Sequence, residues 1–150
     1  MSAETDQHLS LDLTVLDTSG TPVTLAALLG GAKALALYFM RTPTCPMCLR
    51  HVRALARLDL PALGVRPVVV VPGTPAQAAR AGRGLDDRVA VVASADAQAH
   101  RAVGLTRTLF LQHSGVLLVD AAGIVRYRLA AALPTAGFDA AALRAAIDGW

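Results

Sequence analysis

The chain has 150 residues, which is enough for one domain of ordinary size and too few for two. Hydrophobic residues make up 54% and charged residues 17%, so the composition excludes an intrinsically disordered protein. The net charge is only +3 and aromatic residues are 4%, which excludes a nucleic-acid surface built from basic and stacking side chains. No apolar run approaches the roughly 18 residues of a membrane span. We expect a single domain over residues 1–150.

The N-terminal half begins with a predicted hairpin. Apolar and polar residues alternate over 9–16, which predicts a half-buried strand, and residues 21–23 predict a short returning strand. Thr24 is a candidate N-cap for a short helix over 25–29. The continuous apolar run 34–40 predicts a buried central strand.

A turn and a longer helix follow this central strand. Pro46 suits the first helical position, and we expect Pro61 to end the helix. Apolar residues recur at helical spacing on one face, and the opposite face carries Arg50, Arg53 and Arg57.

The second half repeats the alternation of strands and helices. Predicted strands lie at 68–71, 89–92, 115–120 and 124–129, the last two joined as a hairpin. Predicted helices lie at 74–83, from Ser94 or Asp96 to 101, and at 138–147, while 105–113 is left unassigned. This order predicts an α/β fold with a mixed central sheet, helices on both faces and an N-terminal β-hairpin.

The two cysteines, Cys45 and Cys48, form a Cys-x-x-Cys pair where a buried strand meets a helix N-terminus. Unpaired N–H groups and the helix dipole there stabilise a thiolate, and such settings lower a cysteine pKa to between ~3.5 and ~7.5. Helical neighbours at this spacing have Cβ atoms ~5–6 Å apart, whereas a disulfide needs ~3.5–4.5 Å. Small shifts of the first turn would therefore close the bridge. We expect Cys45 to be the attacking sulfur and Cys48 the resolving one.

Two other interpretations of the cysteines are weaker. Buried inert thiols are common, but a pair at a strand–helix junction is not typical of them. A zinc site needs four ligands, and only Cys45, Cys48 and His51 are local, so we expect neither metal nor cofactor. Two cysteines in a chain without a basic, apolar N-terminal signal favour the cytoplasm.

Neighbouring polar residues have two possible roles each. The Thr42 hydroxyl can face the Cys45 sulfur or serve the turn alone. Arg41 and Arg50 flank the pair and would favour a thiolate, although arginines on a helix usually form a solvated face. His51 points away from Cys45 on a helical wheel, so we expect it at the surface.

The stretch 37–48 resembles the active-site strand, turn and helix of the thioredoxin superfamily, and within it the peroxiredoxin branch, the alkyl hydroperoxide reductase / thiol-specific antioxidant family. Residues 11–20 resemble that family's first hairpin, Thr42 to Cys45 match its Thr-x-x-Cys, and 116–125 follow its later order. The resemblance implies an enzyme that reduces hydroperoxides at a thiolate. The resulting sulfenic acid condenses with a second thiol, and a thioredoxin-like electron donor reduces the disulfide. A homodimer is a further possibility for such a protein.

The chain departs from the family pattern at the substrate side of the site. Tyr38 stands where the family has proline, and His113–Ser114 stand where peroxiredoxins have an arginine and thioredoxins a cis-proline. Ser114 offers only a neutral donor to substrate. The arginines that remain as substrate-binding candidates are Arg41, Arg107 and Arg126.

These observations predict a thiol peroxidase that works through a Cys45–Cys48 dithiol/disulfide cycle, oriented by Thr42. A missing charged donor at Ser114 predicts peroxide reduction slower than the family norm. Two alternatives stay open. One is a thioredoxin-like oxidoreductase acting on protein disulfides, and the other is a non-enzymatic redox sensor whose disulfide switches an interface.

Overall fold

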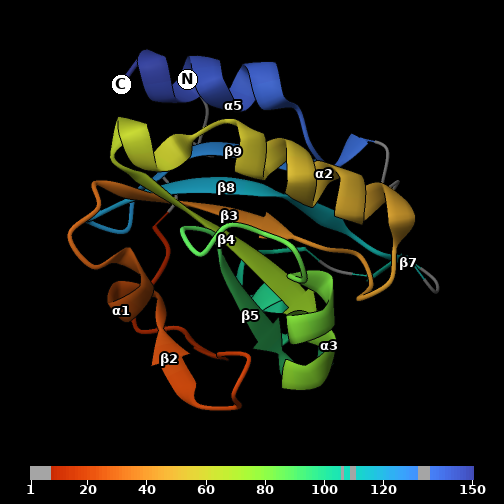
Figure 1. Cartoon of the computed structure of the whole chain (residues 1–150). Helices are drawn as coiled ribbons and strands as arrows, with labels where there is room; N and C mark the ends of the chain where they lie inside the picture. The colour runs from red at the N-terminus through yellow and green to blue at the C-terminus, as the bar shows by residue number, and fades with distance from the viewer. Residues whose placement is uncertain (1–7, 106, 109–110, 132–135) are drawn as a thin grey trace.

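The computed structural model describes residues 8–105, 107–108, 111–131 and 136–150, without the side chains of 96, 107, 108 and 111. Within these ranges a seven-stranded sheet runs in the order β2-β1-β5-β4-β3-β8-β9. Helices lie on both faces of this sheet (Figure 1). The prediction of an α/β fold with a mixed sheet is therefore confirmed.

The centre of the sheet is the strand that leads into the cysteines. β3 (Ala34–Phe39) is buried along its whole length. It pairs in parallel with β4 (Val65–Pro72) and antiparallel with β8 (Ser114–Asp120). The outer strands are β5 (Ala90–Ser94) beside β4, β9 (Val125–Ala131) beside β8, and the N-terminal hairpin of β1 (Thr14–Leu16) and β2 (Pro22–Thr24).

Each face of β3 packs against its own set of helices. Alternate side chains of a strand point to opposite faces, so Ala36 and Tyr38 contribute to one core cluster and Leu37 and Phe39 to the other. The first cluster includes residues of α2 (Pro46–Arg57), α3 (Pro75–Ala81) and α5 (Ala140–Asp148). The second includes residues of α1 (Leu25–Leu29) and α4 (Gln98–Ala102). Both cysteines belong to the first cluster.

Local capping accounts for where several helices begin. The Thr24 hydroxyl accepts a hydrogen bond from Ala27 N–H at the start of α1. Thr74 forms a capping box with Gln77 at the start of α3. Single turns of 3₁₀ helix complete the connections, η2 (Leu60–Leu63) after α2 and η3 (Ala95–Ala97) before α4. No helix in the described ranges combines the length and apolarity needed to cross a bilayer.

Three predicted boundaries are wrong or incomplete. The stretch 9–16 is a strand only over β1, because a turn in which Leu13 N–H bonds the Ser10 carbonyl interrupts it. Helix α2 ends at Arg57, four residues before Pro61. Two residues after this end, Asp59 takes a left-handed backbone with φ of 51°. The unassigned 105–113 stretch contains a small antiparallel pair, β6 (Arg107–Thr108) with β7 (Leu111–Gln112).

Candidate active site around Cys45 and Cys48

The cysteine site lies where the chain leaves the C-terminal end of β3. Met40 N–H still bonds the Val70 carbonyl, and then a short turn carries the chain to Cys45. Cys45 is the N-cap of α2 and Pro46 occupies the first turn, as the sequence predicts. Its carbonyl accepts the first helical hydrogen bond, from Leu49 N–H at 3.0 Å. The Cys45 sulfur is thereby held at the positive end of the α2 dipole.

The two thiols interact directly and differ in environment. Cys48 N–H donates to Cys45 Sγ at 3.3 Å, so the Cys45 side chain accepts a hydrogen bond in the way that an N-cap side chain does. Cys45 is 3% exposed and Cys48 is fully buried. Burial raises the pKa of Cys45, but hydrogen bonds from Cys48 and the Arg41 guanidinium outweigh it, so that pKa lies below its ordinary value. Burial raises the pKa of Cys48, and the neighbouring Cys45 adds to the rise.

Arg41 contacts the pair from both its side chain and its backbone. Its guanidinium lowers the Cys45 pKa through a hydrogen bond and through its charge. Its backbone N–H donates to Cys48 Sγ at 3.4 Å. Within the described part of the chain, Arg41 Nε is buried and has no hydrogen-bond partner. A buried donor without a partner, beside a low-pKa thiol, is suited to an oxygen atom of a bound substrate.

Thr42 supports the site through its backbone. Its carbonyl accepts a hydrogen bond from Cys45 N–H at 3.4 Å, which shapes the turn before α2. The Thr42 side chain is half-buried. The geometry therefore agrees with the turn role, and an orienting role for the hydroxyl stays a prediction.

Ser114 lies on the same face of the sheet as the cysteines. β8 pairs with β3 so that Val116 lies opposite Tyr38, and Ser114 is two positions before Val116. Side chains two apart on a strand share a face. Ser114 is fully buried, and its Oγ has no hydrogen-bond partner among the described residues. Like Arg41 Nε, it is therefore a buried polar atom without a partner among the described residues.

The other two candidate arginines are not placed at the cysteines. Arg126 forms an ion pair with Asp120 at 2.9 Å, at the end of β8 remote from Ser114, and its guanidinium lies over the Trp150 ring. The backbone of Arg107 belongs to β6, but its side chain lies outside the described residues. Of these three candidates, Arg41 is the one whose described side chain acts on the Cys45 sulfur.

Two residues of the site were not recognised from the sequence. The Tyr38 hydroxyl lies 3.0 Å from His51 Nδ1, and their rings pack edge to face. The Tyr38 hydroxyl also interacts with the Cys48 thiol. The prediction that His51 lies at the surface is wrong in part, because the ring is half-buried against Tyr38 and Phe138. Its spacing of three from Cys48 on one helix is the signal that could have indicated this.

The family model for the AhpC/TSA family matches residues 7–128, most of the chain and all of the cysteine site. The chain belongs to the AhpC/TSA family. The prediction of a peroxiredoxin-like thiol oxidoreductase, an enzyme, is confirmed at this level. No curated protein sequence matches the chain significantly.

Several solved structures are similar in fold to this AhpC/TSA protein. A peroxidoxin, BcpB of Mycobacterium tuberculosis, is 20% identical over 96% of this chain and 94% of its own, with a TM-score of 0.76. A thiol peroxidase of Chromobacterium violaceum is 17% identical over 97% of this chain and 86% of its own, with a TM-score of 0.77. A secreted M. tuberculosis disulfide oxidoreductase homologous to E. coli DsbE is 19% identical over 93% and 97%, with a TM-score of 0.66. At these identities the likeness shows the shared thioredoxin-like fold alone.

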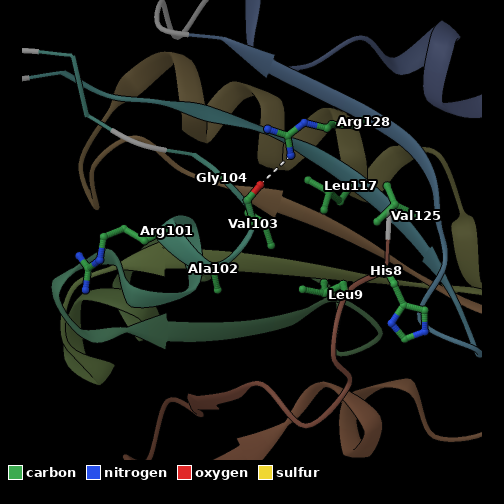
Figure 2. Close-up of a pocket in the computed structure, with 9 residues that line it drawn as sticks. All are labelled: His8, Leu9, Arg101, Ala102, Val103, Gly104, Leu117, Val125 and Arg128. Atoms are coloured by element: carbon green, nitrogen blue, oxygen red, sulfur yellow. Dashed lines mark hydrogen bonds between the residues drawn. The ribbon is translucent and has the colours of Figure 1, made fainter. Parts of the chain in front are cut away.

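A separate cavity of about 330 Å³ lies on the face of the sheet opposite the cysteines, and Figure 2 shows it. Its basic side chains do not converge. Arg128 points toward the Val103 carbonyl and donates to it at 2.6 Å, while Arg101 points away from the other labelled residues (Figure 2). His8 lies at another edge of the same cavity. In this AhpC/TSA protein the cavity is therefore separate from the thiol chemistry.

Proposed function

We propose that this AhpC/TSA protein reduces hydroperoxides at Cys45 and that Cys48 resolves the oxidised product. The observation that carries the proposal is the Cys45 sulfur at the start of α2, where Cys48 N–H donates to it at 3.3 Å and the Arg41 guanidinium lowers its pKa. A thiolate is the nucleophile in such chemistry, and both contacts favour the thiolate.

The first step breaks the peroxide bond. The Cys45 thiolate attacks the terminal oxygen of ROOH, the S–O bond forms and the O–O bond breaks. The leaving RO⁻ takes a proton to become ROH, and Cys45 becomes a sulfenic acid. Arg41 would donate hydrogen bonds to the peroxide oxygens as negative charge develops on them. The unpartnered Arg41 Nε supports this assignment.

The second step forms the internal disulfide. The Cys48 sulfur attacks the Cys45 sulfur, the S–S bond forms, the S–O bond breaks, the Cys48 proton is released, and the leaving hydroxide takes up a proton to become water. A dithiol donor of the thioredoxin type then reduces the bridge, and its own two thiols become a disulfide. Because Cys48 is buried, we expect the first turn of α2 to open for the donor. The need for this donor also favours a reducing compartment, for which we propose the cytoplasm.

Substrate size favours peroxide over protein disulfide. Cys45 is only 3% exposed, which suits a hydroperoxide better than the extended chain of a protein substrate. The buried, high-pKa Cys48 behind a low-pKa Cys45 nevertheless also suits dithiol exchange with a protein disulfide, which we retain as the second candidate. A homodimer stays a prediction for sedimentation analysis.

The deciding experiment compares both reactions on one preparation. Stopped-flow oxidation by hydrogen peroxide and by an alkyl hydroperoxide is measured beside insulin-disulfide reduction, with Cys45→Ser and Cys48→Ser as variants. We expect fast oxidation that requires Cys45, and disulfide formation that requires both thiols. Wild-type oxidation no faster than that of free cysteine would remove the peroxidase assignment and leave disulfide exchange in front.

A further inference from the structure

Tyr38 and His51 form a hydrogen-bonded pair directly behind the cysteines. Tyr38 is fully buried on β3, and its hydroxyl lies 3.0 Å from Nδ1 of His51 on α2. The Phe138 ring packs against both, with centroids 5.9 Å from Tyr38 and 5.6 Å from His51. The pair is therefore held between β3, α2 and the segment entering α5, on the side of the sheet that α2 covers (Figure 1).

This pair connects the buried Cys48 thiol to the surface. Cys48 and His51 are three residues apart on α2, a spacing that places side chains on one face of a helix. Tyr38 and Cys48 lie in the same buried core cluster, and the tyrosine hydroxyl is close enough to the thiol to lower the Cys48 pKa. Cys48 is fully buried, whereas His51 is only half-buried. The sequence of contacts thus runs from a thiol without access to water to an imidazole that has it.

Cys48 needs such a connection to react. Only the thiolate attacks another sulfur, and burial disfavours the charged thiolate. A proton must therefore leave Cys48 as its sulfur approaches Cys45. Phenol and imidazole can pass it on, because a tyrosine hydroxyl both accepts and donates and a neutral imidazole accepts.

We propose that Tyr38 and His51 form a proton relay that deprotonates Cys48 when Cys48 attacks Cys45. The Cys48 S–H donates to Tyr38 Oη, and the Tyr38 O–H donates to unprotonated His51 Nδ1. On attack the thiol proton moves to Tyr38, the hydroxyl proton moves to His51, and the imidazolium later loses it to water. The tyrosine then donates to the new thiolate. This relay deepens the proposed function, on which it rests only in taking Cys48 as the resolving thiol.

The surroundings keep His51 ready to accept a proton near neutral pH. Burial alone lowers the His51 pKa below its ordinary value of 6.5, so the ring is neutral at pH 7. The titratable groups facing the relay are Cys45 and Cys48, with Arg41 beside them. From the segment entering α5 the contact is the apolar Phe138 ring, and the adjacent Asp139 acts on Tyr127 instead.

The test uses a reaction without peroxide, so that its outcome is independent of the proposed substrate. Dithionitrobenzoate labels Cys45 and releases one thionitrobenzoate, and attack by Cys48 on the mixed disulfide releases a second. In that second phase the Cys48–Cys45 bond forms, the bond to thionitrobenzoate breaks, and thionitrobenzoate leaves as an anion. The variants are Tyr38→Phe and His51→Gln. The matched controls are Tyr127→Phe, whose hydroxyl acts on the pKa of neither thiol, and His8→Gln, at the cavity on the opposite face of the sheet.

We expect the wild-type second phase to change little between about pH 6.5 and pH 8, because neutral His51 accepts the proton throughout. Tyr38→Phe and His51→Gln should slow this phase about 100-fold at pH 7, within the range of general-base catalysis. Their rates should rise about tenfold per pH unit, following the thiolate fraction of Cys48. The first phase and both control variants should behave as wild type.

Several results would overturn the relay. A Tyr38→Phe or His51→Gln protein that closes at the wild-type rate, or that keeps the wild-type pH profile at a lower rate, shows a structural role only. Equal slowing of both phases shows a general disturbance of the site. If Tyr38→Phe does not fold, His51→Gln at its half-buried position decides alone. Failure of peroxide reduction with an intact relay would instead remove the proposed function.

Discussion

Arg41 carries the most direct test of the peroxide step. Arg41→Met keeps most of the aliphatic length of the side chain and removes the guanidinium beside Cys45. The exposed Arg50 on α2 offers a matched control, Arg50→Met. A hydrogen bond to a charged group contributes ~1.5–3 kcal/mol, which corresponds to about 10- to 150-fold in rate. We therefore expect Arg41→Met to lower the second-order rate constant for peroxide by that factor at pH 7.

Two effects contribute to this loss, and pH separates them. The Arg41 guanidinium lowers the Cys45 pKa, so its removal reduces the thiolate fraction near neutral pH. At a pH where Cys45 is fully ionised in both proteins, that effect disappears. The defect that persists there measures the lost contact between Arg41 and the peroxide oxygens.

The assay is stopped-flow oxidation over a pH series, with the Cys45 pKa measured in parallel from alkylation rates. Arg41→Met should show a raised Cys45 pKa and a residual defect at high pH, while Arg50→Met shows neither. If the rate constant of Arg41→Met stays within about twofold of that of Arg50→Met at every pH, Arg41 is not the donor to the peroxide oxygens. Arg107→Met would then be the next variant to measure.

Three further predictions concern the thiols, a buried histidine and a glycine. Alkylation should follow a lower pKa in Cys48→Ser than in Cys45→Ser, because Cys45 has the lowered thiol pKa; the reverse order would exchange the two roles. His100 donates from Nε2 to the Met40 carbonyl at 2.6 Å, and burial lowers its pKa to about 4, so the folded state disfavours its protonation. Denaturant unfolding should therefore lose up to about 3 kcal/mol of stability as pH falls from 6.5 to 4, and His100→Gln should flatten that part of the profile relative to wild type; an unchanged slope contradicts the cause. Gly115→Ala would place a Cβ against the Leu129 carbonyl oxygen of β9 and should cost about 3 kcal/mol, so a neutral effect on the melting temperature would refute the close approach.

The sequence alone was sufficient for features that depend on neighbouring residues. The apolar run of β3, the caps at Thr24 and Thr74, and Pro46 after Cys45 each act within a few positions of the chain. The Cys45 environment follows from the same local rule, because a helix N-terminus offers unpaired N–H groups wherever it occurs. These features were enough to predict the fold class, the cysteine pair and its placement.

Other features depended on what packs against each element. Alternating burial over residues 9–16 holds for Leu9 and Val15, yet pairing extends only over β1, because hydrogen bonding needs a partner strand along the whole length. Helix α2 ends before Asp59, which takes a left-handed backbone. Aspartate adopts this conformation only occasionally, so its presence in the sequence does not mark a helix end as a glycine would.

The chemistry behind Cys48 was visible only in three dimensions. Tyr38 and His51 are 13 positions apart, and their contact requires β3, α2 and Phe138 to pack together. The choice of Arg41 over Arg126 is of the same kind, since Asp120 and Trp150 hold Arg126 at the other end of the sheet. Sequence spacing determines which side chains share one face of one element. Which faces meet is determined by burial of the whole core, and that energy is a sum over residues from the entire chain.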